Sequence, residues 1–171
     1  MMWVTATFHS ASVDATDELG RLIGRFLDRG DVVALAGAMG SGKTQLTKGI
    51  ARGLEVPEDE PVLSPTFVLV REYAGRLPLL HCDVYRLGAI DAFADLGLAE
   101  VAAEIGAVTV IEWADRFAEL VPEQAWWIDC RHKAEQHREY VLRLPDEDHT
   151  RALCEAVRSL GSRPNVTIRR G

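Results

Sequence analysis

The stretch GAMGSGKT, from Gly37 to Thr44, lies between the apolar run DVVALA and the helix-like run QLTKGIARGL. It fits the pattern G-x-x-x-x-G-K-[ST] without a gap, in the strand, loop and helix context that this pattern requires. Glycines let the backbone turn tightly and aim successive N–H groups at phosphate oxygens, and the following helix directs its positive dipole end at the same anion. The sequence therefore predicts a phosphate-binding loop.

The residues of this loop have distinct expected roles in binding a nucleotide. Lys43 is expected to reach the β- and γ-phosphates, and the Thr44 hydroxyl is expected to ligate Mg²⁺. No guanine-reading N-K-x-D motif follows a later strand, where IEWADR and IDCRHK stand instead, so ATP is the expected nucleotide. The remaining expected nucleotide contacts are Gly37, Ala38, Met39, Gly40, Ser41, Gly42 and Gln45.

Short runs rich in β-branched and other apolar residues predict the strands of one mixed sheet. The runs Thr66–Tyr73 and Leu77–Asp83 are separated by a short loop containing glycine, which favours an antiparallel hairpin. The runs AWWIDCR and EYVLRL are expected to form an antiparallel pair at the sheet edge. The other expected strands are Trp3–Phe8, Asp31–Ala36 and the run GAVTVIEW.

Segments with a helical period of apolar residues alternate with these strands. The first is expected to begin at a cap, Ser12 or Asp14, and to end at Gly30. The others are Lys43 to Leu54, about Asp91 to Glu104 with a break at Gly97, ADRFAEL, and DEDHTRALCEAVRSLG with Ala152, Leu153, Ala156, Val157 and Leu160 facing inward. The expected fold class is α/β: a single-domain P-loop NTPase fold over residues 1–161, with a mixed, mostly parallel sheet, helices on both faces and an antiparallel hairpin. Residues 162–171 are expected to be a flexible tail.

Composition and charge argue against several classes of protein. The formal net charge of −7 disfavours a sequence-independent grip on nucleic acid, although Arg131, Lys133 and Arg138 could form a local basic patch. Nothing approaches the ~20 consecutive apolar residues of a membrane helix and no signal-peptide layout is present, so we expect a cytoplasmic protein without a membrane partner. The three cysteines are scattered without a CxxC pair, which is typical of reduced thiols.

Two acidic residues directly follow apolar runs, because Asp83 ends LPLLHCD and Glu112 ends AVTVIE. In open α/β sheets the ligand lies beyond the carboxyl ends of the strands, so these residues are candidates for binding Mg²⁺ and orienting water. An acid at a strand end can also cap a helix. Thr66, in SPTF, stands where a switch segment senses the γ-phosphate in small GTPases, although a strand-starting threonine explains the same position.

Three aromatic or titratable residues, His81, Tyr85 and Trp113, flank the two acids. Each could line the nucleotide pocket or pack in the core, and the sequence leaves both readings open. Arg86 and Arg116 are candidates for stabilising charge on the phosphates, although surface ion pairs are the alternative use.

The motifs GAMGSGKT, SPTFVLVREY, HCDVYRL, DLGL and VIEWADR, in this order and spacing, resemble the bacterial TsaE (formerly YjeE) family from about Gly30 to Arg116. The resemblance implies a small Mg²⁺-dependent ATPase required for threonylcarbamoyladenosine formation in tRNA. It implies action with the TsaD and TsaB proteins, with tRNA contacted only indirectly through that complex. The family usually has an acidic residue where this chain has Ala38, so one polar contribution to the site or to partner contact is in doubt.

The resemblance also implies roles for individual residues. Lys43, Glu112, Asp83 and Thr66 would be catalytic, and Thr44 with Asp83 or Glu112 would organise Mg²⁺. Glu112 is the preferred group for orienting water and Asp83 the preferred neighbour of the metal, with the reverse assignment left open. ATP would order the segment around Thr66 and hydrolysis would release it, which makes a nucleotide-driven switch.

Two other functions fit the same loop. A small-molecule kinase would need an acceptor pocket and an arginine-bearing lid, and no such arginine cluster follows the fourth strand. An ATP-binding regulatory module with little hydrolysis shares the loop, so only the roles of Asp83 and Glu112 separate it from an ATPase.

Overall fold

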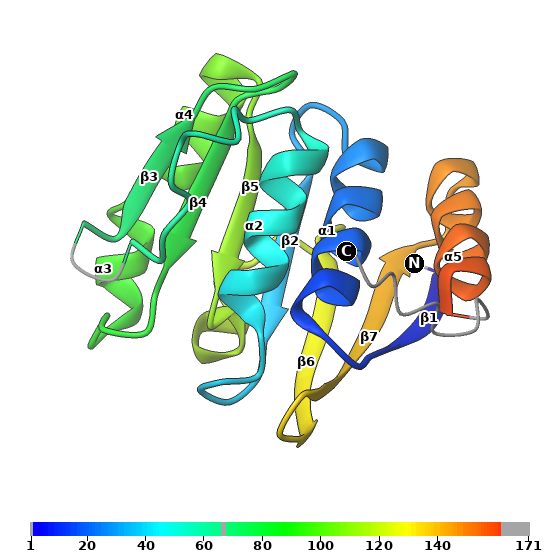
Figure 1. Ribbon diagram of the computed structural model, residues 1–171. Helices are drawn as coiled ribbons and strands as arrows, with labels where there is room; N and C mark the ends of the chain where they lie inside the picture. Colours follow the sequence, from blue (N-terminus) through cyan, green and yellow to red (C-terminus); the bar gives the residue numbers. More distant parts are fainter. Residues whose placement is uncertain (1, 66–67, 162–171) are drawn as a thin grey trace.

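The computed structural model describes residues 2–65 and 68–161, and a seven-stranded sheet runs through its centre (Figure 1). The strands follow the spatial order β1-β7-β6-β2-β5-β4-β3. Their bounds are β1 Trp3–Ser10, β2 Val32–Ala36, β3 Val70–Tyr73, β4 Leu79–Asp83, β5 Val108–Glu112, β6 Trp126–Ala134 and β7 His137–Pro145. The helices are α1 Val13–Phe26, α2 Lys43–Gly53, α3 Ile90–Ala94, α4 Leu98–Ile105 and α5 Asp148–Gly161, with a 3₁₀ helix η1 at Ala114–Leu120.

The sheet is mixed, with a parallel centre. Strands β6, β2, β5 and β4 pair in parallel, whereas β7 pairs antiparallel with both β6 and β1, and β3 pairs antiparallel with β4. Strand β1 therefore runs in the direction of the central strands, and only β7 and β3 oppose the rest. The expected mostly parallel sheet with an antiparallel hairpin is confirmed.

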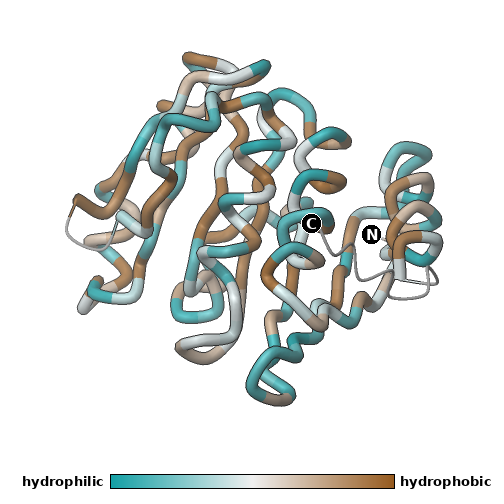
Figure 2. The backbone as a smooth tube through the Cα atoms, viewed as in Figure 1, coloured by the Kyte–Doolittle hydropathy of each residue, from teal (hydrophilic) through white to brown (hydrophobic). Residues whose placement is uncertain are grey.

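Helices cover both faces of the sheet, as the sequence predicts. One face packs against α1, α2 and α5 through fully buried residues such as Leu19, Ile50 and Leu153. The other face packs against α3 and η1, where the rings of Phe93 and Phe117 lie 5.5 Å apart. Figure 2 shows apolar residues along the central strands. No helix in the described ranges combines the length and the apolar character needed to cross a membrane.

Four glycines bring α1 and α2 into close contact. A Cβ added at Gly20 would lie 2.6 Å from the Cα of Gly49, and one added at Gly24 would lie 2.8 Å from the Cα of Gly53. Backbone atoms at such distances cannot accommodate a side chain, so the two helices approach through glycine pairs. This contact fixes α2, the helix that follows the loop from Gly37 to Gly42.

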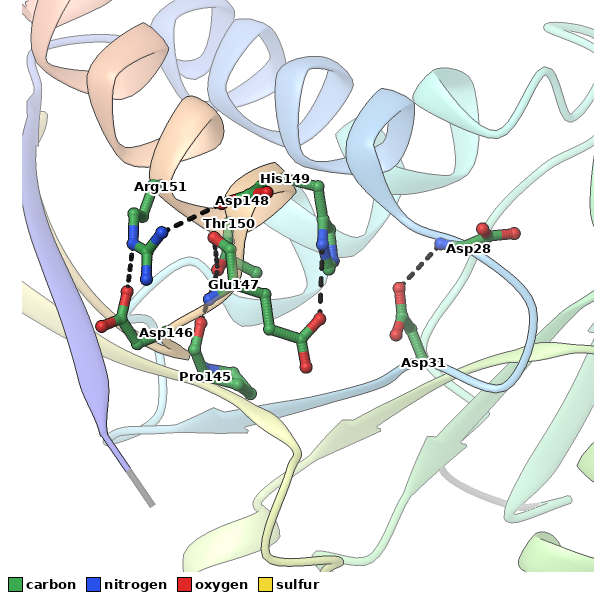
Figure 3. Close-up of polar contacts among 9 residues, drawn as sticks. All are labelled: Asp28, Asp31, Pro145, Asp146, Glu147, Asp148, His149, Thr150 and Arg151. Carbon is green, nitrogen blue, oxygen red and sulfur yellow. Dashed lines mark hydrogen bonds and ion pairs between the residues drawn. The ribbon is translucent and has the colours of Figure 1, made fainter.

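The first helix ends earlier than the sequence indicates. Ser12 is its cap and accepts a hydrogen bond from the Ala15 N–H, but the helix stops at Phe26 and not at Gly30, because Leu27 has an extended backbone. A turn follows, in which the Asp28 N–H donates to the Asp31 carboxylate at 2.7 Å (Figure 3). The Asp31 carboxylate competes with the helix carbonyls for the Asp28 N–H, and this competition ends the helix.

The hairpin strands are shorter than expected. The N–H groups of Val68 and Leu69 both donate to the Pro65 carbonyl, and Leu69 has a φ of +64°, so this segment is a turn and β3 begins at Val70. Strand β4 likewise begins at Leu79 and not at Leu77. Thr66 lies outside the described residues, as does the predicted tail of residues 162–171.

The pair β6–β7 does not lie at the sheet edge, which corrects the expectation. Strand β1 pairs over its whole length with β7, from Trp3 opposite Pro145 to Ser10 opposite Arg138, and takes the edge position. It does so because its alternating residues, including Ala6 and Phe8, are buried against the core.

Helix α5 covers the sheet beside β1 with most of the expected stripe, because Leu153 and Val157 are buried and Leu160 packs against the core. Its buried residues are Thr150, Leu153, Cys154 and Val157, whereas Ala152 is exposed. The Thr150 hydroxyl donates to the Pro145 carbonyl at 2.5 Å, which sets the rotation of the helix at its first turn (Figure 3). The helical region predicted at 91–104 is split at Gly97, as expected, into α3 and α4.

Candidate functional site: a pocket at the carboxyl ends of β2, β4 and β5

The loop from Gly37 to Gly42 joins the end of β2 to the start of α2. Gly37 and Gly42 have φ values of +137° and +98°. A Cβ at Gly37 would lie 2.1 Å from the Cys130 carbonyl oxygen, and one at Gly42 would lie 2.3 Å from the Tyr140 hydroxyl. Both positions therefore require glycine, for backbone conformation and for space.

Helix α2 begins directly after this loop and presents its N-terminus there. The Leu46 N–H donates to the Gly42 carbonyl at 2.9 Å, which is the first bond of the helix ladder. The preceding N–H groups, at the first helical residues, have no acceptor within the helix. Together with the helix dipole they form an environment that favours an anion.

Lys43 lies inside the loop. Its ammonium donates to the Gly37 carbonyl at 2.6 Å and the Ala38 carbonyl at 2.9 Å, and it lies 3.6 Å from the centroid of the Trp113 ring. Burial lowers the pKa of Lys43, and the nearby carboxylates of Glu112 and Asp83 act in the opposite direction. Trp113 is therefore a neighbour of Lys43 at the pocket as well as a packed aromatic.

Glu112, at the end of β5, is the point where three elements meet. It is buried, and its Oε2 accepts a hydrogen bond from the Thr44 hydroxyl at 2.8 Å. Its Oε1 accepts from the Thr47 hydroxyl at 3.3 Å and contacts His81 Nε2 at 2.7 Å. Thr44 and Thr47 come from α2 and His81 from β4, so the carboxylate is held from two sides.

Asp83 lies directly opposite Glu112 in the pairing of β4 with β5. Its Oδ2 accepts from the Ser64 hydroxyl at 2.5 Å, and its Oδ1 accepts from the Tyr85 N–H at 2.9 Å. The bond from the Tyr85 N–H fixes the backbone that follows β4. The bond from Ser64 fixes the segment that precedes Thr66.

A pocket of about 410 Å³ opens between these groups. This volume falls within the range of about 300–1,000 Å³ that is common for small-molecule sites. Of the predicted nucleotide contacts, Gly37, Ala38 and Ser41 belong to the loop but do not line the pocket. The lining residues are Met39, Gly40, Gly42, Lys43, Thr44, Gln45, Ser64, Asp83, Tyr85, Arg86, Glu112 and Trp113.

The aromatic and cationic candidates have different places. Tyr85 lies at the rim, 38% exposed, with its ring 4.6 Å from that of Trp113, whereas His81 is fully buried below the pocket. Arg86 lines the pocket. Arg116 is engaged elsewhere, because its guanidinium donates to the carbonyls of Tyr85 and Leu87 and so fixes the loop after β4.

The basic residues of β6 and β7 are largely engaged within the chain. Arg131 and Lys133 each lie 3.2 Å from the Glu139 carboxylate, and hydrogen bonds from Lys133 and Arg131 lower the pKa of Glu139. Arg138 donates to the Gly40 carbonyl at 3.0 Å and to carbonyls of the hairpin turn. These contacts weaken the hypothesis of a local basic patch that contacts RNA or a partner. The bond from Arg138 to Gly40 also joins the hairpin to the loop from Gly37 to Gly42.

Three contributions were not anticipated from the sequence: Ser64 as a partner of Asp83, and Thr47 and His81 as partners of Glu112. Thr47 follows Thr44 by three positions, which places both on one helix face, and this spacing could have indicated the pair. Ser64 belongs to the SPTF motif. No local signal indicates that His81 contacts Glu112, because that contact depends on strand pairing.

The donor set fits a magnesium ion bound with nucleotide phosphates. Mg²⁺ in phosphate-transfer sites typically takes one or two carboxylates together with phosphates and water. The described residues contain no cluster of three or more His, Cys, Asp or Glu side chains that could hold a metal alone. The Thr44 hydroxyl gives its proton to Glu112, which leaves its lone pairs available to a cation.

Comparisons with known proteins show the family to which this chain belongs. Residues 10–140 match the family model described as threonylcarbamoyl adenosine biosynthesis protein TsaE. The tRNA threonylcarbamoyladenosine biosynthesis protein TsaE of Treponema pallidum is 44% identical over 133 residues, covering 78% of this chain and 96% of that protein. The protein of the same name from Bacillus subtilis is 38% identical over 136 residues, covering 79% and 83%. The crystal structure of Bacillus subtilis YdiB superposes with a TM-score of 0.74 at 31% identity, covering 93% of this chain and 97% of that one. The chain belongs to the TsaE family of threonylcarbamoyl adenosine biosynthesis proteins.

Proposed function

We propose that this chain is a Mg²⁺-dependent ATPase that serves tRNA threonylcarbamoyladenosine biosynthesis as a nucleotide-driven switch. The family supports the pathway, because the relatives at 44% and 38% identity carry that biosynthesis in their names. One observation carries the chemistry: Lys43, the Thr44 hydroxyl and the carboxylates of Asp83 and Glu112 all line one pocket.

The glycine loop and the start of α2 would bind the triphosphate. Backbone N–H groups and the helix dipole supply an anion site without side-chain charge. Lys43 would exchange its bonds to the Gly37 and Ala38 carbonyls for phosphate oxygens, a short movement within the same loop. Replacing the usual acidic residue by Ala38 leaves this backbone cradle unchanged.

The hydrogen bond between Thr44 and Glu112 supports one of the two assignments that the sequence leaves open. A hydroxyl that ligates a cation benefits from a carboxylate that accepts its proton, and Glu112 lies in that position at 2.8 Å. We therefore assign Glu112 to the magnesium side and Asp83 to the attacking water, the reverse of the preferred expectation. Thr44 and Glu112 would hold the Mg²⁺ ion, which would supply positive charge to offset the charge that develops on the phosphates.

The contact between Ser64 and Asp83 supports the switch. It links the segment before Thr66 directly to the group proposed to orient water. The role of Thr66 as the γ-phosphate sensor stays a prediction. TsaD and TsaB are the proposed partners, with tRNA reached only through them, and an arginine from a partner could complete the charge stabilisation.

ATP turnover with and without TsaD and TsaB, in Mg²⁺ and in excess EDTA, tests this proposal. We expect slow phosphate release that rises with the partners and disappears in EDTA. Lys43→Ala should abolish nucleotide binding in calorimetry, and Glu112→Gln should abolish turnover, whereas Glu155→Gln on the exposed side of α5 should change neither. ATP consumption only with an added metabolite would indicate a kinase, and no turnover even with the partners would indicate a binding module. Unchanged turnover in Glu112→Gln would refute the role of Glu112. Each of these results would contradict the proposal.

A further inference from the structure

His81 is a polar side chain in a position that otherwise suits an apolar one. It lies in the middle of β4 and is fully buried. Its ring centroid is 6.5 Å from that of Tyr73. The adjacent β4 residues Leu80 and Cys82 are also buried. A histidine at such a site must form hydrogen bonds, or it carries the cost of burying polar atoms.

The described residues offer this ring one polar contact. Its Nε2 lies 2.7 Å from Glu112 Oε1, whereas its Nδ1 is buried without a hydrogen-bond partner among them. Because a carboxylate oxygen only accepts, Nε2 carries the proton and donates it. Among the described residues, the polar contact that the His81 ring makes is therefore this donor bond to Glu112.

We propose that His81 is a positioning residue for the magnesium side of the site. Its Nε2–H fixes the Glu112 carboxylate so that the opposite oxygen, Oε2, holds the Thr44 hydroxyl in the orientation that ligates the cation. This inference rests on the proposed function, because it assigns a task to His81 through Glu112 and Thr44. Without His81, the described residues would leave Oε1 with the 3.3 Å bond from Thr47 alone, and the carboxylate could rotate.

The geometry of amide side chains provides a matched test. The amide nitrogen of glutamine is as many bonds from Cβ as His Nε2, whereas that of asparagine matches Nδ1. His81→Gln should therefore retain the donor to Glu112, and His81→Asn should lose it while remaining polar and small. Loss of an outer-sphere partner lowers metal affinity or activity by about 10–100-fold.

The experiment measures turnover against Mg²⁺ concentration, and nucleotide affinity in calorimetry with excess EDTA, for wild type and both variants. We expect His81→Asn to need about 10–100-fold more Mg²⁺ for half-maximal turnover. We also expect its affinity in EDTA to stay within about twofold of wild type, and His81→Gln to behave as wild type in both assays. Equal losses in both variants, or no shift in His81→Asn, would overturn the proposal. If wild type itself shows no Mg²⁺-dependent nucleotide binding, the proposed function fails first and this inference falls with it.

A measurement on the unaltered chain covers the case in which the variants do not fold. ¹⁵N NMR of the histidine side chains should show a proton on Nε2 of His81, and its Nε2 resonance should move when ATP is added with Mg²⁺. It should not move when ATP is added with EDTA. A proton on Nδ1, or equal responses to both additions, would contradict the assignment.

Discussion

Replacing Gly42 with alanine should destabilise the fold through one identifiable contact. The new Cβ would lie 2.3 Å from the Tyr140 hydroxyl oxygen, and Tyr140 is fully buried with that hydroxyl 3.2 Å from the Thr16 hydroxyl. The φ of +98° at Gly42 adds backbone strain for any residue with a Cβ. Two separable costs therefore act at one position.

Their sizes follow from these contacts. Left-handed backbone strain costs about 1–2 kcal/mol, and forcing extra volume into a packed core costs about 1–3 kcal/mol, so Gly42→Ala should lose about 2–5 kcal/mol. Tyr140→Phe alone should lose about 0.5–1.5 kcal/mol with the hydroxyl's bond. In that background the nearest Tyr140 atom is Cζ at 3.4 Å, an ordinary contact, so only the strain remains.

The assay is urea unfolding of wild type, both single variants and the double variant. The double variant should be more stable than additivity predicts by about 1–3 kcal/mol. Gly40→Ala is the matched control, since its φ is +75° but an added Cβ meets nothing within 4 Å, and it should show the strain alone. Additive losses in the double variant, or equal losses for Gly42→Ala and Gly40→Ala, would refute the reasoning.

Two further predictions concern single carboxylates. Burial raises the pKa of the Asp31 carboxyl in the folded state above its ordinary value of 3.8. The free energy of unfolding therefore falls as pH rises from 3.8 through the pKa of the folded state. The ionised carboxylate still destabilises the fold at neutral pH. Asp31→Asn should therefore be more stable than wild type at pH 7 in thermal unfolding, with the difference shrinking below about pH 3, and parallel pH profiles would contradict this. Ser64→Ala removes one of the two hydrogen bonds that the described residues donate to the Asp83 carboxylate. It should lower turnover by about tenfold at unchanged ATP affinity in calorimetry, and unchanged turnover would count against the role of Asp83.

Local sequence was sufficient to predict the loop and the acids. The strand, glycines, Lys43 and Thr44 form one continuous segment, and Asp83 and Glu112 each end an apolar run, so each feature depends on neighbouring residues only. The rule that parallel strands share one carboxyl edge then brings them together without further information. Gly40, Gly42, Lys43, Thr44, Asp83 and Glu112 do line one pocket.

What the sequence did not reveal depends on pairing between distant segments. The contact of His81 with Glu112 requires the β4–β5 register that sets Asp83 opposite Glu112, and no local period encodes a register. The edge position of β1 likewise depends on its pairing with β7 at the other end of the chain. The early end of α1 depends on the Asp31 side chain, which competes for a backbone N–H.

A crystal structure of this chain with Mg²⁺ and a non-hydrolysable ATP analogue tests the central claim most directly. We predict the triphosphate along the glycine loop and the Thr44 hydroxyl oxygen about 2.1 Å from the ion. The Glu112 carboxylate should remain bonded to Thr44, and Asp83 should face the γ-phosphate. An ion bound with both carboxylates turned away from it, or a triphosphate outside the loop, would contradict the account.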